Sequence, residues 1–226
     1  MIDNKKFKVF IACDTKNISK VRKIIKETKT NELKIGYKFG LEFLNSKNGR
    51  NFISKLKNKI IFADLKLHDI PNTCASAIKA MRDLKINYLT MHISSGLEAI
   101  KAAKKVSGKT KLIGVTILTS LDNKALKEIG FNKDVKKLVL RQANLANKAR
   151  LDAVVCSAQE VNIVKKVFKK EIITPGIRFD DNTNDQKRVL TPKQAYKNGS
   201  DWLVIGRPIT KGNIKKNIKT LIDHLT

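Results

Sequence analysis

Short apolar runs alternate with amphipathic segments along nearly the whole chain, and this alternation restricts the fold more than any other feature of the sequence. The apolar runs are rich in β-branched and aromatic residues, as is typical of strands buried on both faces of a parallel sheet. We predict strands at Val9–Asp14, Leu33–Lys38, Ile60–Lys66, Tyr88–His92, Lys111–Thr116, Ala153–Ser157, Ile172–Thr174 and Trp202–Gly206. The segments between them have helical spacing and predict helices at Ile18–Lys29, Pro71–Leu84, Leu97–Val106, Val135–Lys148, Gln159–Phe168, Pro192–Asn198 and Ile214–His224.

The number and order of these units predict a barrel. Repeated strand–helix–strand units imply a parallel sheet with right-handed crossovers. Eight of them form a (β/α)8 TIM barrel, whose active site lies at the carboxyl ends of the strands. No change of composition marks a linker, and 226 residues suit an undivided barrel, so we expect a single domain over residues 1–226. A doubly wound open sheet is the alternative.

The chain carries an extreme formal net charge of +27, with 47 Lys and Arg against 20 Asp and Glu. Such an excess is typical of proteins that bind nucleic acids. Here the lysines are scattered along the predicted helices, and aromatic residues that could stack on bases make up only 6%. We therefore expect no nucleic-acid partner, and we expect the charge to favour anionic ligands.

The sequence also bears on cellular location. No apolar run approaches the roughly 18–20 residues that a membrane-spanning helix needs, and the first residues lack the apolar core of a signal peptide. Cys13, Cys74 and Cys156 are odd in number and show no CxxC spacing, which favours reduced thiols in the core. We expect a soluble, cytoplasmic protein with no membrane partner.

The third predicted strand ends in a group of charged residues. Asp64 and Lys66 are two residues apart and are expected to share a face of the strand, and Asp69 follows on the next turn. Lys38 and Asp14 end the second and first predicted strands, so a barrel would bring two cations and three anions to one mouth. Burying such charges is costly unless they pair or act on a substrate. A purely structural ion-pair network is the alternative.

The last third of the chain carries a phosphate-binding pattern. Gly206-Arg207 lies at the carboxyl end of the eighth predicted strand, where barrels commonly form phosphate sites. Glycine lets a backbone N–H approach a phosphate oxygen, and arginine offers a bidentate fork. The polar stretch 174–188 follows the seventh strand, and its length favours a functional loop in which Gln186 could add a contact. A surface loop without a functional role is the alternative.

Five segments resemble, in order, the orotidine 5′-phosphate decarboxylase family. The most specific is Asp64-Leu65-Lys66-Leu67-His68-Asp69-Ile70-Pro71-Asn72-Thr73, because related barrel decarboxylases and aldolases keep Asp-x-Lys-x-x-Asp without the Ile-Pro-Asn-Thr that follows. The others are Val115-Thr116-Ile117-Leu118-Thr119-Ser120, Pro175-Gly176-Ile177-Arg178, Asp185-Gln186-Lys187-Arg188 and Ile205-Gly206-Arg207-Pro208. The resemblance runs from about Asp14 to Pro208. One small departure is Cys13, where the family more often has an aliphatic residue before the aspartate.

The resemblance implies an activity and a partner. The family converts orotidine 5′-monophosphate to uridine 5′-monophosphate and carbon dioxide, the last step of de novo pyrimidine nucleotide synthesis. It does so without a cofactor, as a homodimer whose active sites lie at the interface between subunits.

The resemblance also implies roles for individual residues. The catalytic set would be Lys66 as proton donor, Asp64 beside the departing carboxylate, Asp69 from the partner subunit, and Lys38 completing the charge network. The substrate-binding set would be Asp14 and Lys38 on the ribose, Thr73 from the partner, Ile70, Thr119 (or Ser120) on the pyrimidine, and Arg178, Gln186, Gly206 and Arg207 on the phosphate.

Two other functions compete with this one. A sister barrel enzyme acting on a sugar phosphate, such as a keto-gulonate phosphate decarboxylase or a hexulose phosphate synthase, would need magnesium. The sequence has no HExxH motif and no His–carboxylate cluster at ligand spacing, so no metal site is predicted. A basic RNA-binding barrel without catalytic activity is the other alternative, and intact Asp64, Lys66 and Asp69 argue against it.

Overall fold

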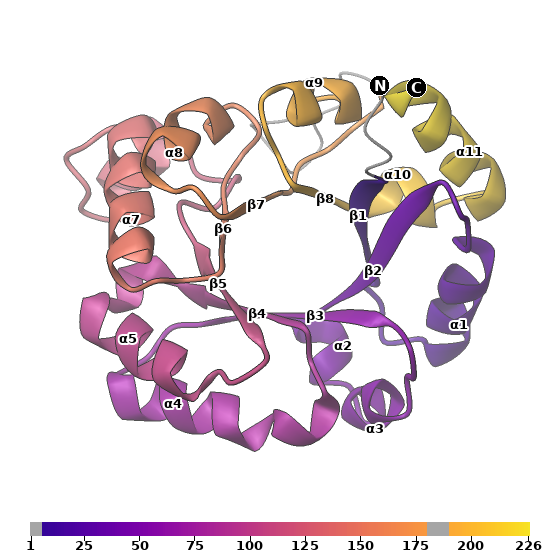
Figure 1. Ribbon diagram of the computed structural model, residues 1–226, viewed down its shortest axis with the longest axis horizontal. Helices are drawn as coiled ribbons and strands as arrows, with labels where there is room; N and C mark the ends of the chain where they lie inside the picture. Colours follow the sequence, from indigo (N-terminus) through magenta and orange to yellow (C-terminus); the bar gives the residue numbers. More distant parts are fainter. Residues whose placement is uncertain (1–5, 180–189) are drawn as a thin grey trace.

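The computed structural model describes residues 6–179 and 190–226. Its eight strands are parallel, pair in chain order and close into a barrel in which β1 pairs with β8 (Figure 1). The strands are β1 Phe7–Ala12, β2 Leu33–Gly40, β3 Ile60–Leu67, β4 Tyr88–His92, β5 Lys111–Val115, β6 Ala153–Val155, β7 Glu171–Thr174 and β8 Trp202–Ile205. The predicted (β/α)8 barrel is confirmed, and the doubly wound alternative is wrong.

Helices form a ring around the strands, as Figure 1 shows. They are α1 Ile18–Glu27, α2 Leu41–Leu44, α3 Gly49–Ser54, α4 Pro71–Ala80, α5 Leu97–Val106, α6 Asn123–Glu128, α7 Val135–Lys148, α8 Val161–Val167, α9 Pro192–Lys197, α10 Arg207–Thr210 and α11 Ile214–Leu225, with short 3-10 turns at Arg82–Leu84 and Ile93–Ser95. The helix predicted over Pro71–Leu84 is too long, because the chain tightens into the first 3-10 turn after Ala80 and then turns at Lys85, whose φ is +50°.

The barrel interior is filled by large rings rather than left as a channel. Phe10 stacks on Trp202 with ring centroids 4.1 Å apart and meets Phe62 edge-on at 4.9 Å. Gly36 makes room for this layer, because a Cβ there would lie 2.6 Å from the Phe10 ring. A second, larger group of buried side chains lies between the strands and the helices. The packed interior leaves chemistry to the ends of the strands.

The floor of the barrel, at the amino ends of the strands, carries a repeated polar contact. The residue just before β4, β6 and β8 accepts a hydrogen bond from a backbone N–H near the start of the preceding strand. These three strand brackets join Asn87 Oδ1 to the Ile61 N–H (2.7 Å), Asp152 Oδ2 to the Leu112 N–H (2.8 Å) and Asp201 Oδ2 to the Ile172 N–H (2.8 Å). The brackets therefore fasten β3 to β4, β5 to β6 and β7 to β8.

Glu171 closes the floor beneath the aromatic layer. Its carboxylate accepts hydrogen bonds from Lys111 Nζ (2.8 Å), the Tyr88 hydroxyl (3.0 Å) and Trp202 Nε1 (3.4 Å). Burial alone would raise the pKa of Glu171, but the hydrogen bond and charge of Lys111 outweigh it and hold this pKa below its ordinary value.

We expect Glu171→Gln to lower the free energy of unfolding by about 1–3 kcal/mol, because the neutral amide loses charge-assisted hydrogen bonds, and to leave turnover unchanged. Since the folded-state pKa lies below the unfolded one, the carboxylate stabilises the fold fully above an ordinary pKa of about 4.3, and this contribution is lost as the pH falls through the lowered value. Urea unfolding at neutral and acidic pH measures both effects. Glu98→Gln is the matched control, because Glu98 pairs with Lys101 on the surface. An equal loss in the two variants would contradict the assignment.

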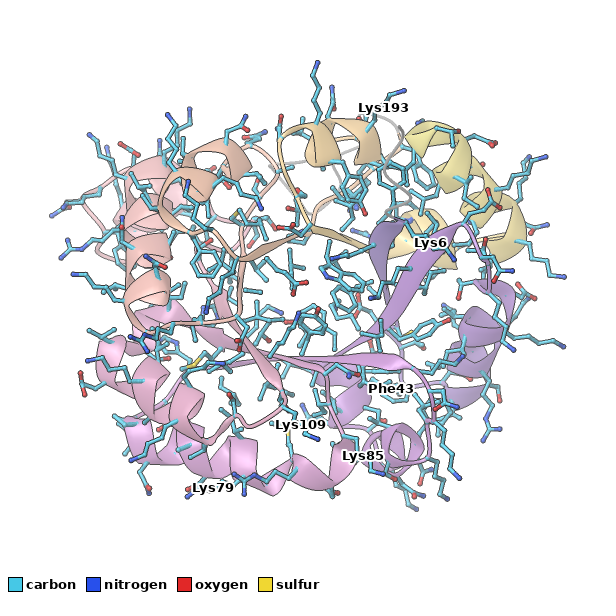
Figure 2. All side chains as sticks on the ribbon, in the orientation of Figure 1. Lys6, Phe43, Lys79, Lys85, Lys109 and Lys193 are labelled. Carbon is cyan, nitrogen blue, oxygen red and sulfur yellow. The ribbon has the colours of Figure 1, made fainter. Side chains whose placement is uncertain are left out.

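The cysteines and lysines lie where the composition predicts them. The three cysteines are free and buried, as predicted. Lysine side chains such as Lys79 and Lys193 point outward from the helical ring (Figure 2), so the excess charge is spread over the surface. Among the helices of residues 6–179 and 190–226, none combines the length and apolarity that crossing a bilayer requires.

Candidate active site

A cavity of about 400 Å³ opens at the carboxyl ends of the strands. Every strand except β4, or the loop after it, contributes to its wall. Its lining consists of Ala12, Asp14, Lys38, Phe62, Asp64, Lys66, Val115, Ile117, Leu118, Thr119, Val155, Pro175, Gly176, Arg178, Val204, Gly206 and Arg207. Charged side chains thus lie toward β1–β3, apolar ones toward β5 and β6, and arginines toward β7 and β8.

Charges of alternating sign cross one side of this cavity. Lys38 Nζ lies 3.0 Å from Asp14 Oδ1 and 3.3 Å from Asp64 Oδ2, and Lys66 Nζ lies 2.9 Å from Asp64 Oδ2. Asp14 stands beyond the end of β1 rather than in it, since that strand ends at Ala12. The structure therefore brings together four of the charged residues that the sequence predicted.

Burial and pairing set the charge states of this network. Asp64 and Lys38 are 8% and 9% exposed. Burial alone would raise the pKa of Asp64, yet the ammonium groups of Lys38 and Lys66 hold it below its ordinary value. Burial alone would lower the pKa of Lys38, yet Asp64 and Asp14 raise it above its ordinary value. Asp64 is therefore a carboxylate and Lys38 an ammonium at neutral pH.

An irregularity in β3 aims Lys66 at the cavity. The pairing with β4 shifts register between Ala63 and Leu67, and Lys66 has a φ of +51°. Asp64 and Lys66 are in contact, as predicted. The alternation of side chains along a regular strand does not fully account for this contact, because three residues of β3 lie opposite the single residue Thr90 of β4. Bulges of this kind often re-aim a side chain next to an active site.

Asp69, Ile70 and Thr73 do not line the cavity of their own chain. All three are exposed, Ile70 to 66%, and Asp69 Oδ1 accepts a hydrogen bond from the Ile70 N–H next to it at 2.7 Å. The whole stretch from His68 to Thr73 is exposed where α4 begins. Within one chain the structure therefore separates these three predicted site residues from the other site residues.

The arginine side of the cavity contains the predicted phosphate-binding residues. Arg178 is buried after β7, and Gly206 and Arg207 follow β8, with Arg207 opening the short helix α10. Gly206 has a φ of −104°, so its use is to leave bare backbone at the cavity wall rather than to permit an unusual turn. Gln186 lies outside the described residues. Thr119 lines the cavity whereas its neighbour Ser120 does not.

Sequence reasoning missed Thr90 and most of the apolar wall. Thr90 is fully buried beneath the charged network, and it is bonded to Asp64 and to the backbone of Lys66. The only signal in the sequence is that a polar residue lies inside a buried strand. This signal is weak, because threonine is β-branched and is common in strands for that reason alone. Ile117, Leu118 and Val155 belong to the apolar wall. Ile117 and Leu118 fall within the segment from Val115 to Ser120 that resembles the family, but no role was predicted for them, because apolar residues at strand ends are also ordinary core.

A second groove of about 460 Å³ lies on the outer surface between α1 and α3. Its cations are Arg22, Lys26, Lys29, Lys55 and Lys59, and none of the carboxylates in residues 6–179 and 190–226 lines it. The described residues lining it form no acid–base pair, and no carboxyl end of a strand is among them, so we place the chemistry at the barrel mouth.

Comparisons with known proteins identify what the chain is similar to. A sequence model of the Orotidine 5'-phosphate decarboxylase / HUMPS family matches residues 8–218. Orotidine 5'-phosphate decarboxylase of Wolbachia sp. subsp. Brugia malayi (strain TRS) is 43% identical over 221 residues, with 95% of this chain and 96% of that protein covered. The enzyme of the same name from Coxiella burnetii (strain RSA 493 / Nine Mile phase I) is 42% identical over 234 residues, with 94% and 97% covered.

One solved structure agrees with these sequence relatives. The crystal structure of orotidine 5'-phosphate decarboxylase from Lactobacillus acidophilus superimposes with a TM-score of 0.82 at 31% identity, covering 98% of this chain and all of that one. The match extends over the barrel and over the mouth described above.

Proposed function

The chain belongs to the orotidine 5′-phosphate decarboxylase family, whose reaction yields uridine 5′-monophosphate and carbon dioxide, and we propose that the network of Asp14, Lys38, Asp64 and Lys66 carries out this reaction. The observation that carries the proposal is the contact of Lys66 Nζ with Asp64 Oδ2 at 2.9 Å, at the wall of the cavity. It offers a fixed ammonium group where negative charge must develop.

Lys66 supplies charge stabilisation and then a proton. When the bond between C6 of the pyrimidine and its carboxylate breaks, the electron pair stays on C6 and carbon dioxide leaves. The ammonium stabilises this carbanion and donates a proton to C6, leaving an amine that takes a proton from water. One such charge pair at about 4 Å in an effective dielectric near 20 amounts to roughly 4 kcal/mol. Enzymes lower barriers by about 8–23 kcal/mol, so other interactions supply the rest.

Asp64 serves two purposes in this mechanism. It holds Lys66 Nζ in place, and its negative charge faces the carboxylate that departs. The same two ammonium groups that keep Asp64 ionised limit the repulsion it can exert, so we assign the larger share of catalysis to Lys66.

Binding at the far end of the substrate supplies the remaining energy. We assign Asp14 and Lys38 to the ribose hydroxyls, Thr119 to the pyrimidine, and Arg178, Gly206 and Arg207 to the phosphate, since all six line the cavity. Interactions with a remote phosphate lower the barrier when they position the reacting carbon against the charged groups.

Turnover of orotidine 5′-monophosphate in the presence of a chelator tests this function. Lys38 and Lys66 already supply positive charge on both sides of Asp64, and a divalent cation would have to displace an ammonium group, so we expect EDTA to leave the rate unchanged. The assay follows loss of the orotate absorbance. Magnesium-dependent turnover of a hexulose or keto-gulonate phosphate, with none of the nucleotide, would instead support the sugar-phosphate enzymes.

Arg207→Ala should act through the phosphate alone. Losing one bidentate charge-assisted contact should lower kcat/KM for orotidine 5′-monophosphate about 100-fold and leave slow turnover of the nucleoside orotidine unchanged. Lys211→Ala removes an exposed cation four residues further on and is the control. A matching loss on the phosphate-free nucleoside would count against the assignment.

We also propose a homodimer in which each active site is completed by the other subunit. Asp69 and Thr73 are exposed and lie away from the cavity of their own chain. They flank Ile70, which is 66% exposed, and Leu41 is another exposed apolar side chain, at 52%. Covering apolar side chains while delivering Asp69 and Thr73 to a second cavity is what a two-fold interface at this edge would accomplish.

The remaining partner and location assignments are proposals of the same kind. We propose a cytoplasmic enzyme, since three buried free thiols suit a reducing compartment. We propose one domain over residues 1–226 and no nucleic-acid partner, because exposed lysines occur on helices all around the barrel and aromatic residues that could stack on bases make up only 6%.

A further inference from the structure

Thr90 occupies an unusual position in the β3–β4 pairing. Ala63 pairs with Leu89 and Leu67 pairs with Met91, so Thr90 is the single residue of β4 that faces Asp64, Leu65 and Lys66. A regular ladder has no carbonyl in place for the extra backbone groups at such a bulge. The side chain of Thr90 is fully buried, so water does not take the carbonyl's place there.

The hydroxyl of Thr90 meets both of the groups that the bulge brings together. Thr90 Oγ1 accepts a hydrogen bond from the Lys66 N–H at 2.9 Å and donates one to Asp64 Oδ1 at 3.0 Å. The directions are fixed, because an amide N–H can only donate and an ionised carboxylate can only accept. One hydroxyl therefore fixes the backbone of the left-handed residue Lys66 and the orientation of the Asp64 carboxylate.

The carboxylate of Asp64 is held from two sides as a result. Oδ2 faces the ammonium groups of Lys38 and Lys66, at 3.3 and 2.9 Å, and Oδ1 faces Thr90. Without the hydroxyl the carboxylate could rotate about its last bond, and the Lys66 N–H would lose its partner. A displacement of a catalytic group by about 1 Å can lower the rate about 100-fold.

We propose that Thr90 is a positioning residue for the decarboxylation, acting through the backbone of Lys66 and the carboxylate of Asp64 without touching the substrate. The inference rests on the proposed function, and it extends the site to β4, the one strand that contributes nothing to the cavity wall.

The test compares Thr90→Val, which keeps the shape and removes the hydroxyl, with Thr90→Ser, which keeps the hydroxyl. Thr90→Val should lower kcat about 10- to 100-fold, as expected for losing hydrogen bonds to a charged group, and should leave the dissociation constant of uridine 5′-monophosphate within about threefold of wild type. Thr90→Ser should keep kcat within about threefold. Titration with uridine 5′-monophosphate also gives the number of folded binding sites, so kcat is calculated per folded site.

Thr28→Val is the matched control. Thr28 is equally buried and its hydroxyl also has two partners, the Ile24 carbonyl at 2.8 Å and the Tyr37 hydroxyl at 3.0 Å, but it caps α1 outside the barrel. This variant should lose stability and keep kcat.

Three results would overturn the proposal: an unchanged kcat in Thr90→Val, an equal loss in Thr90→Ser, or an equal loss in Thr28→Val. If Thr90→Val does not fold, Thr90→Ala replaces it, and failure of both to fold would show that the residue is structural instead. Turnover by the wild-type enzyme in the same assay tests the function separately.

Discussion

Lys66→Ala is expected to lower kcat for orotidine 5′-monophosphate by at least about 10⁴-fold, with the barrel intact. The substitution removes both the ammonium that stabilises the carbanion and the proton that quenches it, and each of these contributions is commonly worth about 10²-fold or more. Alanine accepts the φ of +51° at this position about as well as lysine does, so the backbone has no new reason to rearrange. Loss of the orotate absorbance gives the rate, and circular dichroism and urea unfolding report the fold.

Lys111→Ala provides the matched control. Lys111 Nζ lies 2.8 Å from Glu171, much as Lys66 Nζ lies 2.9 Å from Asp64, but at the opposite end of the barrel. This variant should lose stability and retain turnover. Activity of Lys66→Ala within about tenfold of wild type would refute the proposed role of Lys66, since a lost proton donor and a lost charge exceed that factor.

Restoration of activity on mixing two inactive variants is the second expected result. If Asp69 acts in the partner's site, Lys66→Ala and Asp69→Ala should each be nearly inactive as homodimers. In the mixed dimer one site collects both substitutions and the other collects neither. Random exchange of subunits should then restore about a quarter of the wild-type activity, because half of the dimers are mixed and each has one intact site.

The experiment requires subunit exchange, which co-expression of two differently tagged chains provides. Purification through both tags isolates the mixed dimer, whose activity should be about half that of the wild type. A mixture of Lys66→Ala with Asp64→Ala is the control, because these residues lie 2.9 Å apart in one chain and every site in the mixed dimer keeps one defect. No recovery with Asp69→Ala would show that Asp69 serves its own chain.

The fold could be predicted because each strand leaves a short apolar run and each long helix leaves a periodic pattern. β4, α5 and α7 begin and end at the predicted residues. The helices that were missed are α2, α3, α6 and α10, none longer than six residues, and so short a helix has no repeat to detect. The predicted carboxyl ends of β1, β5, β6 and β8 lie one or two residues beyond the observed ends. The sequence does not show where the last hydrogen bond of the ladder falls, so these boundaries are the least certain part of the prediction.

The candidate site was predictable where a charged residue follows a strand. Asp14, Lys38, Asp64 and Lys66 lie together as expected, since parallel strands bring their carboxyl ends to one mouth. The bulge in β3 and the hydroxyl beneath it could not be predicted, because both depend on the pairing register with β4 rather than on β3 itself. The position of Asp69, exposed and outside the cavity of its own chain, could not be predicted from the residues either, because the strand-end pattern places it beside Asp64 and Lys66.

The three strand brackets give the barrel a division of labour between its two ends. Asn87, Asp152 and Asp201 secure neighbouring strands at the floor, and none of the three lines the cavity at the mouth. Substitutions in the loops at the mouth can therefore change the substrate while these floor contacts keep the barrel closed. The matching family is described by two names, orotidine 5'-phosphate decarboxylase and HUMPS. Divergence of function on one barrel is what a separation of stability from chemistry permits.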